Sequence, residues 1–300
     1  MTARGALGHY RRTAERVVQG AFDRAGYHLS RHTFYSPIPV IDELSSSLWD
    51  APSELPGVDL RIDAALELLN GSLMPYLSEF RPPRERPRTG GFWLQNGAYE
   101  SVDADVLYAF VRLFKPRRIY ELGSGASSHV IHMAARANEG DNAPVEHVIF
   151  DPFPFGHSMG PVGGASVKTD RAEHLDASIF DVLEAGDFLF IDTTHTVKTG
   201  GDVTHIFLDI VPRVGPGVLV HIHDIFLPYE YPKDWVITRR RAWAEQYLLQ
   251  TFLAFNDQFE VLMPNYAVAR AAPDVVSRII PSFDARTVRP GGFWISRTQS

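Results

Sequence analysis

From about residue 103 onward, short apolar runs alternate with segments of helical periodicity, and this alternation constrains the fold more than any other feature. Strands are predicted at 118–122, 147–151, 166–169, 187–192, 217–223, 259–263 and 292–297. Helices are predicted at 104–114, at 127–138, from residue 202 and over 239–255. Strands that alternate with helices pair in parallel, so we predict an α/β fold with a doubly wound, Rossmann-like sheet of seven mostly parallel strands.

The first 90 residues lack this alternation. Helical spacing occurs at 9–25 and 62–79, and a proline-rich, mixed-charge segment follows at 81–91. Proline disfavours helix at the residue before it, so 81–91 is predicted to be a linker. We expect an N-terminal helical cap with its linker at 1–90 and a second domain at 91–300. The cap would serve either as a lid over the site or as a homodimer interface.

The composition excludes several classes of function. The 300 residues include no cysteine, which excludes disulfides, thiolate zinc sites and cysteine nucleophiles. A net charge of −7 argues against a nucleic-acid partner, because phosphate contacts need a basic face. No apolar run reaches the length of a membrane span or a signal peptide, so we expect a cytoplasmic protein without a membrane partner.

Residues 118–134, RIYELGSGASSHVIHMA, read as a strand, a tight turn and a helix. Gly123 and Gly125 permit the turn and a close approach of the backbone to a ligand. A dinucleotide fingerprint would have a third glycine where this chain has Ser128, and no lysine completes a phosphate-binding loop. The turn therefore predicts a ligand other than a dinucleotide or a nucleoside triphosphate.

Two carboxylates indicate the charge of that ligand. Glu121, directly before the turn, would repel a diphosphate but would favour an ammonium group. Asp151 ends the next strand, where it could accept hydrogen bonds from both hydroxyls of a ribose. A ligand with a ribose and a positive charge but no phosphate fits this pattern, and S-adenosylmethionine is such a molecule.

Several motifs occur in an order that resembles the class I S-adenosylmethionine-dependent methyltransferases. They are ELGSG, a strand ending in Asp151, FLFIDTTH and PRVGPGVLVHIHDIF, and the resemblance covers about residues 103–297. The blocks at 190–195, 216–225, 231–232 and 245–249 are similar to a bacterial group with small-molecule acceptors, which implies a natural-product acceptor. This chain departs from the usual motif in having Ser127 in place of a glycine and Asp151 in place of the commoner glutamate.

The resemblance also implies which residues contact the donor. The methionine part would face Glu121, Gly123 and Gly125, the ribose would bind Asp151, and the adenine would lie near 169–173. The full set of expected cofactor residues is Glu121, Gly123, Ser124, Gly125, Ser127, Asp151 and Asp192.

Two further strand ends carry groups suited to catalysis. His195 lies three residues beyond one strand, and its imidazole titrates near neutral pH, which suits a general base for a hydroxyl. His221 and His223 point to the same face of the next strand, with His223 nearer its end and Asp224 after it. We expect His221 to be a core residue and His195, His223 and Asp224 to be catalytic.

This arrangement resembles the metal-dependent catechol-type O-methyltransferases. The resemblance implies that Asp192 and Asp224 are metal ligands and that His195 is the base. His223 takes the position of an acid in that family. A histidine there suits manganese, iron or zinc better than magnesium, which prefers oxygen ligands. A divalent metal and a site without one both remain open.

The acceptor pocket is expected to be aromatic. Residues 226–235 hold four aromatic rings and two prolines, as the wall of a pocket for an apolar or aromatic acceptor would. Tyr229 and Trp235 of this loop, Tyr99 and Tyr247 are the expected acceptor residues. Alternatively, these rings pack the cap against the second domain.

The sequence therefore predicts a methyltransferase that acts on a hydroxyl of a small molecule. N-methylation is the first alternative, because a neutral amine needs less help from a base. A non-catalytic module that binds the cofactor or a protein partner is the second. Ser128 and Glu121 argue against an NAD-dependent enzyme.

Overall fold

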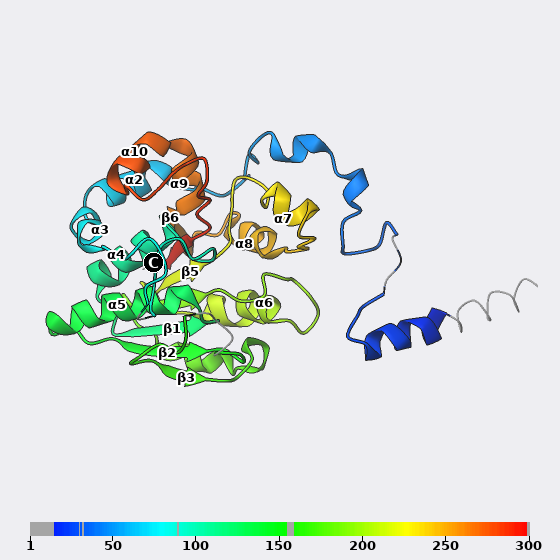
Figure 1. The fold of residues 1–300 in the computed structure, drawn as a ribbon, viewed down its shortest axis with the longest axis horizontal. Coiled ribbons are helices and arrows are strands. Elements are labelled where there is room, and N and C mark those ends of the chain that lie inside the picture. The colour runs from blue at the N-terminus through cyan, green and yellow to red at the C-terminus, as the bar shows by residue number, and fades with distance from the viewer. Residues whose placement is uncertain (1–14, 30, 32, 89, 155–158, 299–300) are drawn as a thin grey trace, which may run out of the picture. The chain divides into compact units, whose positions relative to one another are not determined.

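The computed structural model describes residues 15–29, 31, 33–88, 90–154 and 159–298. The chain divides into two compact units, Met1–Leu48 and Trp49–Ser300 (Figure 1). In the first unit, residues 15–24 are helical, and a short 3₁₀ helix, η1, spans Ile41–Glu43. The helix predicted at 9–25 is therefore confirmed for residues 15–24, and residues 9–14 lie outside the described residues.

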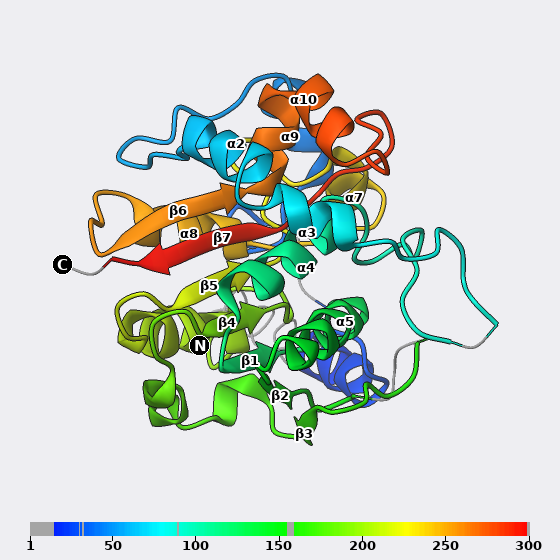
Figure 2. The same ribbon diagram turned by 90° about the vertical axis from the view of Figure 1, so that its left-hand side faces the viewer.

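Within the described residues, seven strands form one sheet in the order β3-β2-β1-β4-β5-β7-β6 (Figure 2). Their bounds are β1 Arg118–Leu122, β2 Glu146–Phe150, β3 Ser166–Lys168, β4 Phe188–Ile191, β5 Leu219–Ile222, β6 Phe259–Pro264 and β7 Phe293–Arg297. β7 runs antiparallel to both of its neighbours, β5 and β6, and the other neighbouring pairs are parallel. The predicted mostly parallel, doubly wound sheet is confirmed.

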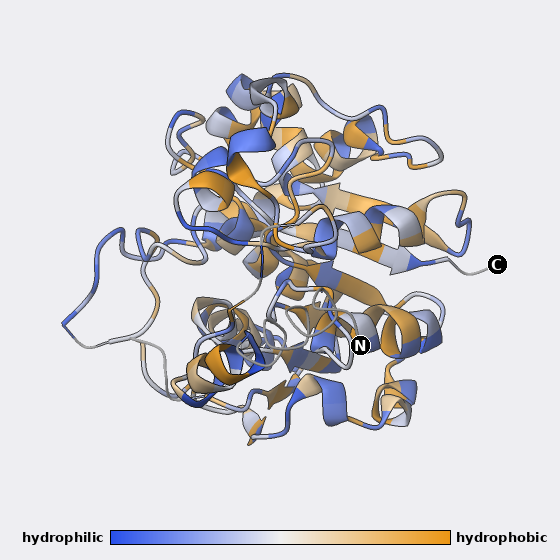
Figure 3. Ribbon diagram, turned by 90° about the vertical axis from the view of Figure 1, so that its right-hand side faces the viewer, coloured by the Kyte–Doolittle hydropathy of each residue, from blue (hydrophilic) through white to orange (hydrophobic). Residues whose placement is uncertain are grey.

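The central strands are buried on both faces because helices cover both sides. On one face, Phe188, Phe190 and Trp294 pack with helices α4 (Asp103–Phe114) and α5 (Ala126–Gly140). On the other face, the core includes residues of α6 (Asp202–His205), of the π-helical turn Ile206–Ile210 and of α8 (Glu245–Leu253). Figure 3 shows the apolar residues gathered along the strands and on the helix faces that meet them.

The prediction of one helix over 62–79 is wrong, because the chain forms α2 (Ile62–Asn70) and α3 (Met74–Glu79). Gly71 caps the end of the first helix, and Pro75 lies in the first turn of the second, where its missing N–H costs nothing. Both helices contribute to the core that packs on the sheet. By packing, the boundary between the units therefore lies at Leu48, earlier than the sequence division at residue 90.

The predicted helix over 239–255 is also wrong in its first half. Helix α7 spans Lys233–Ile237, α8 begins only at Glu245, and residues 238–244 between them are not helical. Arg240 has a positive φ of 56°, which interrupts the helical path. Residues 241–244 connect the two helices without regular secondary structure.

Two more helices follow β6 in the chain, α9 (Asn265–Ala271) and α10 (Pro273–Ile279), and they contact each other. Among the described residues, none of the helices combines the length and the apolar character that spanning a bilayer requires.

Candidate active site

The two glycines of the turn after β1 have different roles. Gly123 has φ +84°, and a Cβ at this position would lie 1.9 Å from the carbonyl oxygen of Asp192, so glycine is required. Gly125 has extended backbone, and a Cβ there would meet nothing within 4 Å. Gly123 thus lets the ends of β1 and β4 come together, whereas Gly125 leaves open space beside the turn.

Asp151 is held at the end of β2 by the same turn. The Ser124 amide donates to Asp151 Oδ2 at 2.9 Å, and the Ser124 hydroxyl donates to the same oxygen. The amide of Phe153 donates to Asp151 Oδ1 at 2.7 Å. These bonds orient the carboxylate at the end of β2, and its contact with a ribose stays a prediction.

A cavity of about 460 Å³ opens at the carboxyl ends of the first four strands. Its lining includes Gly123 and Ser124 after β1, Asp151 after β2, residues 171–173 after β3 and residues 192–194 after β4. Cavities of roughly 300–1,000 Å³ suit small molecules and cofactors. Four of the predicted cofactor residues, Gly123, Ser124, Asp151 and Asp192, therefore line one space.

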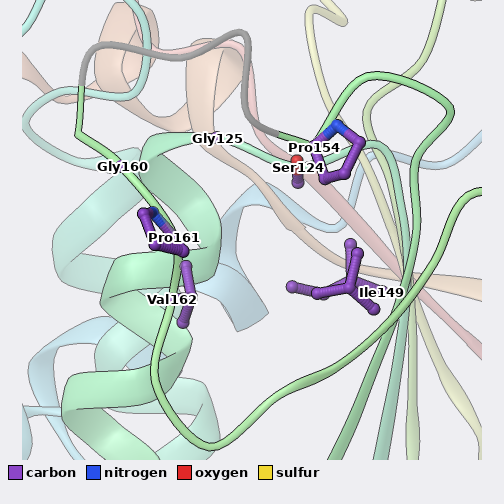
Figure 4. Close-up of a pocket in the computed structure, with 8 residues that line it drawn as sticks. Ser124, Gly125, Ile149, Pro154, Gly160, Pro161 and Val162 are labelled. Carbon is purple, nitrogen blue, oxygen red and sulfur yellow. The ribbon is translucent and has the colours of Figure 1, made fainter.

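A second and much smaller cavity, of about 20 Å³, is also lined by Ser124 (Figure 4). Gly125 borders it, and Ile149 of β2 faces Pro161 and Val162 across it. It holds little more than one water molecule, so the larger cavity is the candidate ligand site.

Glu121 lies beneath the turn and is fully buried. The hydroxyls of Ser127 and Ser128 donate to its Oε1 at 2.8 and 2.9 Å, and His147 Nε2 lies 2.8 Å from its Oε2. Neither Glu121 nor Ser127 lines the large cavity, and their contact with a donor stays a prediction. Ser128, which replaces the third glycine, fixes this buried carboxylate.

A cluster of acids and histidines follows β4 and β5. His195 Nε2 lies 3.3 Å from Asp192 Oδ1 and 3.4 Å from Asp224 Oδ2. His223 Nδ1 lies 3.6 Å from Asp192 Oδ2 and 3.8 Å from Asp224 Oδ1. The structure thus brings together Asp192 and the three residues predicted to be catalytic.

His195 is held from both sides. Its Nδ1 lies 2.8 Å from Glu245 Oε2, and its carbonyl oxygen accepts from the amide of Ala244 at 2.9 Å. Burial opposes a charge on the ring, but hydrogen bonds to Asp192 and Glu245 outweigh it and raise the pKa of His195 to about 10. His195 is therefore a cation at neutral pH in this arrangement.

His223 also faces carboxylates. Burial opposes its charge, but Asp224, Asp192 and Asp103 raise the pKa of His223 well above its ordinary value. Its Nε2 lies 3.4 Å from Asp103 Oδ2 and makes no hydrogen bond with the described residues. Asp192, despite burial, has its pKa lowered by the charge of His223 and by bonds to both histidines.

The residues fit a divalent metal ion. One ligand atom from each of Asp192, His223 and Asp224 lies within 4.8 Å of the others. If His223 Nδ1 faced the ion, Asp103 would lie behind the ring at Nε2, the usual place for a carboxylate that orients a metal-binding histidine. Without a metal ion, the charged ring of His195 faces Asp192 and Asp224, the two acids of this ligand set.

The backbone at two of these residues is strained. His195 and Asp224 both have φ of +57°, a left-handed conformation that non-glycine residues seldom adopt. Such conformations cost roughly 1–3 kcal/mol each and concentrate at functional sites. The sharp turns direct both side chains back toward Asp192.

Comparison with known proteins identifies the central part of this chain. Residues 120–225 match the model of a methyltransferase domain. This part of the chain is therefore similar to a methyltransferase domain. The matched segment runs from β1 to just past Asp224, so it contains the turn, the cavity-lining strand ends and all four members of the cluster.

Two individual proteins are similar to this chain. An uncharacterised protein of Archaeoglobus fulgidus is 27% identical over 161 residues, which cover 50% of this chain and 72% of that protein. A crystal structure from Thermobifida fusca, described as a candidate methyltransferase, is 17% identical over 89% of this chain and 100% of its own, with a TM-score of 0.39. The strand order of the sheet defines the fold of this chain.

His221 lies in the core, as the sequence predicted. His221 is fully buried, its ring stacks on Phe190 with centroids 4.1 Å apart, and it also lies against Trp294. Burial holds the pKa of His221 well below its ordinary value, so the ring is neutral.

Of the four predicted acceptor residues, Tyr229, Trp235 and Tyr247 belong to one connected group of aromatic rings, and Tyr99 lies against His223. Tyr99 is buried, with its ring centroid 4.8 Å from that of His223. Trp235 lies beside Trp243, and Tyr229 packs on Tyr266. Tyr247 is 44% exposed, and its hydroxyl donates to Glu230 instead of facing the cluster. Their contact with an acceptor stays a prediction.

Asp103 and Glu245 were missed as site residues by sequence reasoning. The carboxylate of Asp103 accepts from the amides of Gly291 and Gly292 and from the Asn265 side chain. The first turn of α4 is closed by Asp105, which accepts from the Val102 amide.

Proposed function

We propose that this protein transfers a methyl group from S-adenosylmethionine to a hydroxyl of a small-molecule acceptor. The single observation that carries the proposal is the cavity of about 460 Å³, which joins the turn after β1 to the ends of β2, β3 and β4. It has the size of a nucleoside site and lies at the strand ends, where sheets of this kind bind ligands.

The charge of the cavity supports this donor. Four carboxylates line it, those of Asp151, Glu173, Asp192 and Asp202, against the single guanidinium of Arg171. Such a lining disfavours a diphosphate and favours a cationic ligand such as a sulfonium. In this proposal Asp151 accepts from the ribose hydroxyls, residues 171–173 border the adenine, and Asp192 lies on the side of the sulfonium.

The reaction is an in-line displacement. The acceptor oxygen forms a bond to the methyl carbon while the carbon–sulfur bond breaks, the sulfonium becomes a neutral thioether, and the hydroxyl proton leaves. The protein aligns the two reactants and takes the proton. We assign the proton to His195, whose ring Glu245 positions at 2.8 Å. His195 accepts it in its neutral form, which the positive charge of a donor bound beside Asp192 favours by lowering the pKa of the ring.

Asp192, His223 and Asp224 are the residues that would hold a divalent metal ion. When bound, such an ion would lower the pKa of a coordinated acceptor hydroxyl. Asp103 would orient His223 from behind in either case.

N-methylation is the second candidate, and one observation favours it. Both ring nitrogens of His195 already face carboxylates, Glu245 at Nδ1 and Asp192 with Asp224 at Nε2. A neutral amine acceptor needs no free base, so His195→Ala would then change the rate little. A fall of about 100-fold or more would favour a hydroxyl acceptor.

Calorimetric titration tests the donor. We expect wild-type protein to bind S-adenosylmethionine but not NAD, and Asp151→Asn to weaken that binding by about 10–100-fold through loss of ribose hydrogen bonds. Asp209→Asn, which changes an exposed acid paired with His205 outside the site, is the matched control. Absence of binding to wild-type protein contradicts the proposal. Labelled methyl transfer to metabolites of a cell extract then identifies the acceptor.

A further inference from the structure

Next to the cluster lies an arginine, Arg241, whose side chain makes no hydrogen bond with the part of the chain that the structure describes. The guanidinium carbon of Arg241 lies 4.3 Å from the ring centroid of Trp235 and 4.2 Å from that of Trp243. The Trp243 ring in turn lies 4.3 Å from the His195 ring, centroid to centroid. Arg241 is therefore one aromatic ring away from the proposed base.

Among the described residues, the Arg241 guanidinium has no hydrogen bond and no ion pair. Contact with an aromatic face leaves the N–H groups, which lie in the guanidinium plane, free for a ligand. Its neighbour Arg239 also lies over Trp235, at 5.7 Å, but pairs with Asp234 at 3.7 Å. Position beside the cluster and unused donors distinguish Arg241 from Arg239.

The interrupted helix explains how Arg241 reaches this place. Its amide donates to the carbonyl of Trp235 at 3.0 Å, and the Ala244 amide bonds to His195 three residues later. These bonds fix both ends of the segment 241–244 against the site. The two indole rings then hold the side chain, so little conformational freedom remains to be lost when a ligand binds.

We propose that Arg241 binds an anionic group, a carboxylate, of the methyl acceptor. This inference depends on the proposed function and adds the chemical class of the acceptor: an aromatic or largely apolar molecule with a carboxylate. A guanidinium matches a carboxylate with two parallel hydrogen bonds, and the rings of Trp235 and Trp243 offer flat apolar surface beside it. The carboxylate would be kept away from Asp192 and Asp224, which would repel it.

An alternative role for Arg241 is to neutralise the charge of Asp224, because the electrostatic field of that carboxylate reaches the guanidinium.

A second cavity lined by arginines is an alternative site for an anion. Arg270, Arg286 and Arg289 line a cavity of about 300 Å³, but the latter two pair with Asp284 and Asp234. Arg270 lies over Tyr229 at 5.1 Å. Variants of Arg241 and Arg270 separate these possibilities.

The test compares two ligands of the same shape that differ in charge. Benzoate and benzamide are titrated by calorimetry into wild-type protein and the variants Arg241→Gln, Arg239→Gln and Arg270→Gln, without donor. We expect wild-type protein to bind benzoate about tenfold or more tighter than benzamide, as a charge-assisted pair implies. Arg241→Gln should make the two affinities equal, Arg241→Lys should keep part of the preference, and Arg239→Gln and Arg270→Gln should keep all of it.

Equal affinities in wild-type protein, including no detectable binding of either ligand, overturn the inference. A preference that survives Arg241→Gln, or that Arg270→Gln abolishes, overturns it as well. Thermal unfolding of each variant verifies folding, and Arg241→Lys keeps the test decisive if Arg241→Gln does not fold. Binding of S-adenosylmethionine without a benzoate preference contradicts only this inference, whereas a benzoate preference without donor binding contradicts only the proposed function.

Discussion

The cavity at the ends of β1 to β4 and the cluster at the ends of β4 and β5 both consist of acidic side chains at strand ends, yet they are built differently. In the cavity, Asp151 is held by backbone amides and a serine within one turn, and space remains open in front of it. In the cluster, Asp192 and Asp224 face the rings of His195 and His223 at 3.3–3.8 Å. Hydrogen bonds hold the carboxylate of Asp151 facing open space, where a ligand can bind. The carboxylates of Asp192 and Asp224 are instead faced by the two histidine rings.

Asp192 belongs to both regions, so its replacement should have the largest effect. Asp192→Asn keeps the size of the side chain and removes the charge that both histidines face. We expect methyl transfer to fall by about 1,000-fold, near 4 kcal/mol, with donor affinity falling less than about tenfold. Rates with labelled donor and calorimetry measure the two effects, and Asp209→Asn is the control. Equal losses in both quantities would show that Asp192 serves only the cavity.

The two glycines of the turn give the next largest contrast. Gly123→Ala forces a Cβ against the Asp192 carbonyl at a left-handed φ, so we expect a loss of roughly 3 kcal/mol in the free energy of unfolding. Gly125→Ala has open space and extended backbone, so its stability should change by less than about 0.5 kcal/mol. Urea denaturation of both variants tests this. Equal destabilisation would contradict the separate roles of the two positions.

The charge balance of the cluster predicts how stability depends on pH in metal-free protein. The pKa of His195 is raised from 6.5 to about 10, so the folded state binds an extra proton between these values. Stability is then fully present below pH 6.5 and is lost as the pH rises through about 10.

Because nearby acids share the shift, we expect a loss of roughly 2 kcal/mol between pH 7 and pH 10 in the presence of a chelator. His195→Gln should reduce this slope without abolishing it, because the pKa of His223 is raised as well. His205→Gln, which changes a histidine paired with Asp209 at 2.7 Å outside the site, should keep it. Chemical denaturation across this pH range measures both, and a slope unchanged in His195→Gln would refute the charge assignment.

The smallest effect is expected at Tyr247. Its hydroxyl donates to Glu230 and its ring is half exposed, so Tyr247→Phe should change the methyl-transfer rate by less than about twofold. A large loss of rate would restore Tyr247 as an acceptor residue. Rates with labelled donor at several acceptor concentrations would show whether affinity or turnover changes.

The same contrast explains how much the sequence could predict. Each strand is a short apolar run between helix-breaking segments, so the strands and the acids that follow them were predicted closely. The turn and Asp151 were found because they lie within 30 residues of each other and interact locally. The cavity they line is therefore the part of the site that the sequence predicted best.

The partners of the cluster were missed because they come from distant parts of the chain. Glu245 meets His195 across 50 residues, and its position depends on the interruption at Arg240, where a helical pattern continued in the sequence. Arg241 and Trp243 lie in that interrupted segment. Asp103 reaches Gly291 across 188 residues, through a pairing of β5 with β7 that local periodicity does not reveal.

The bonds of Asp103 have a consequence for how the protein assembles. One carboxylate joins the start of α4, the end of β6 through Asn265, the residues before β7 and the ring of His223. Since β7 inserts between β5 and β6, the support behind His223 exists only after the last strand has paired. The residues that line the cavity at the ends of β1 to β4 all precede residue 203, whereas the carboxylate behind His223 is held in place only once residues 291–297 have joined the sheet.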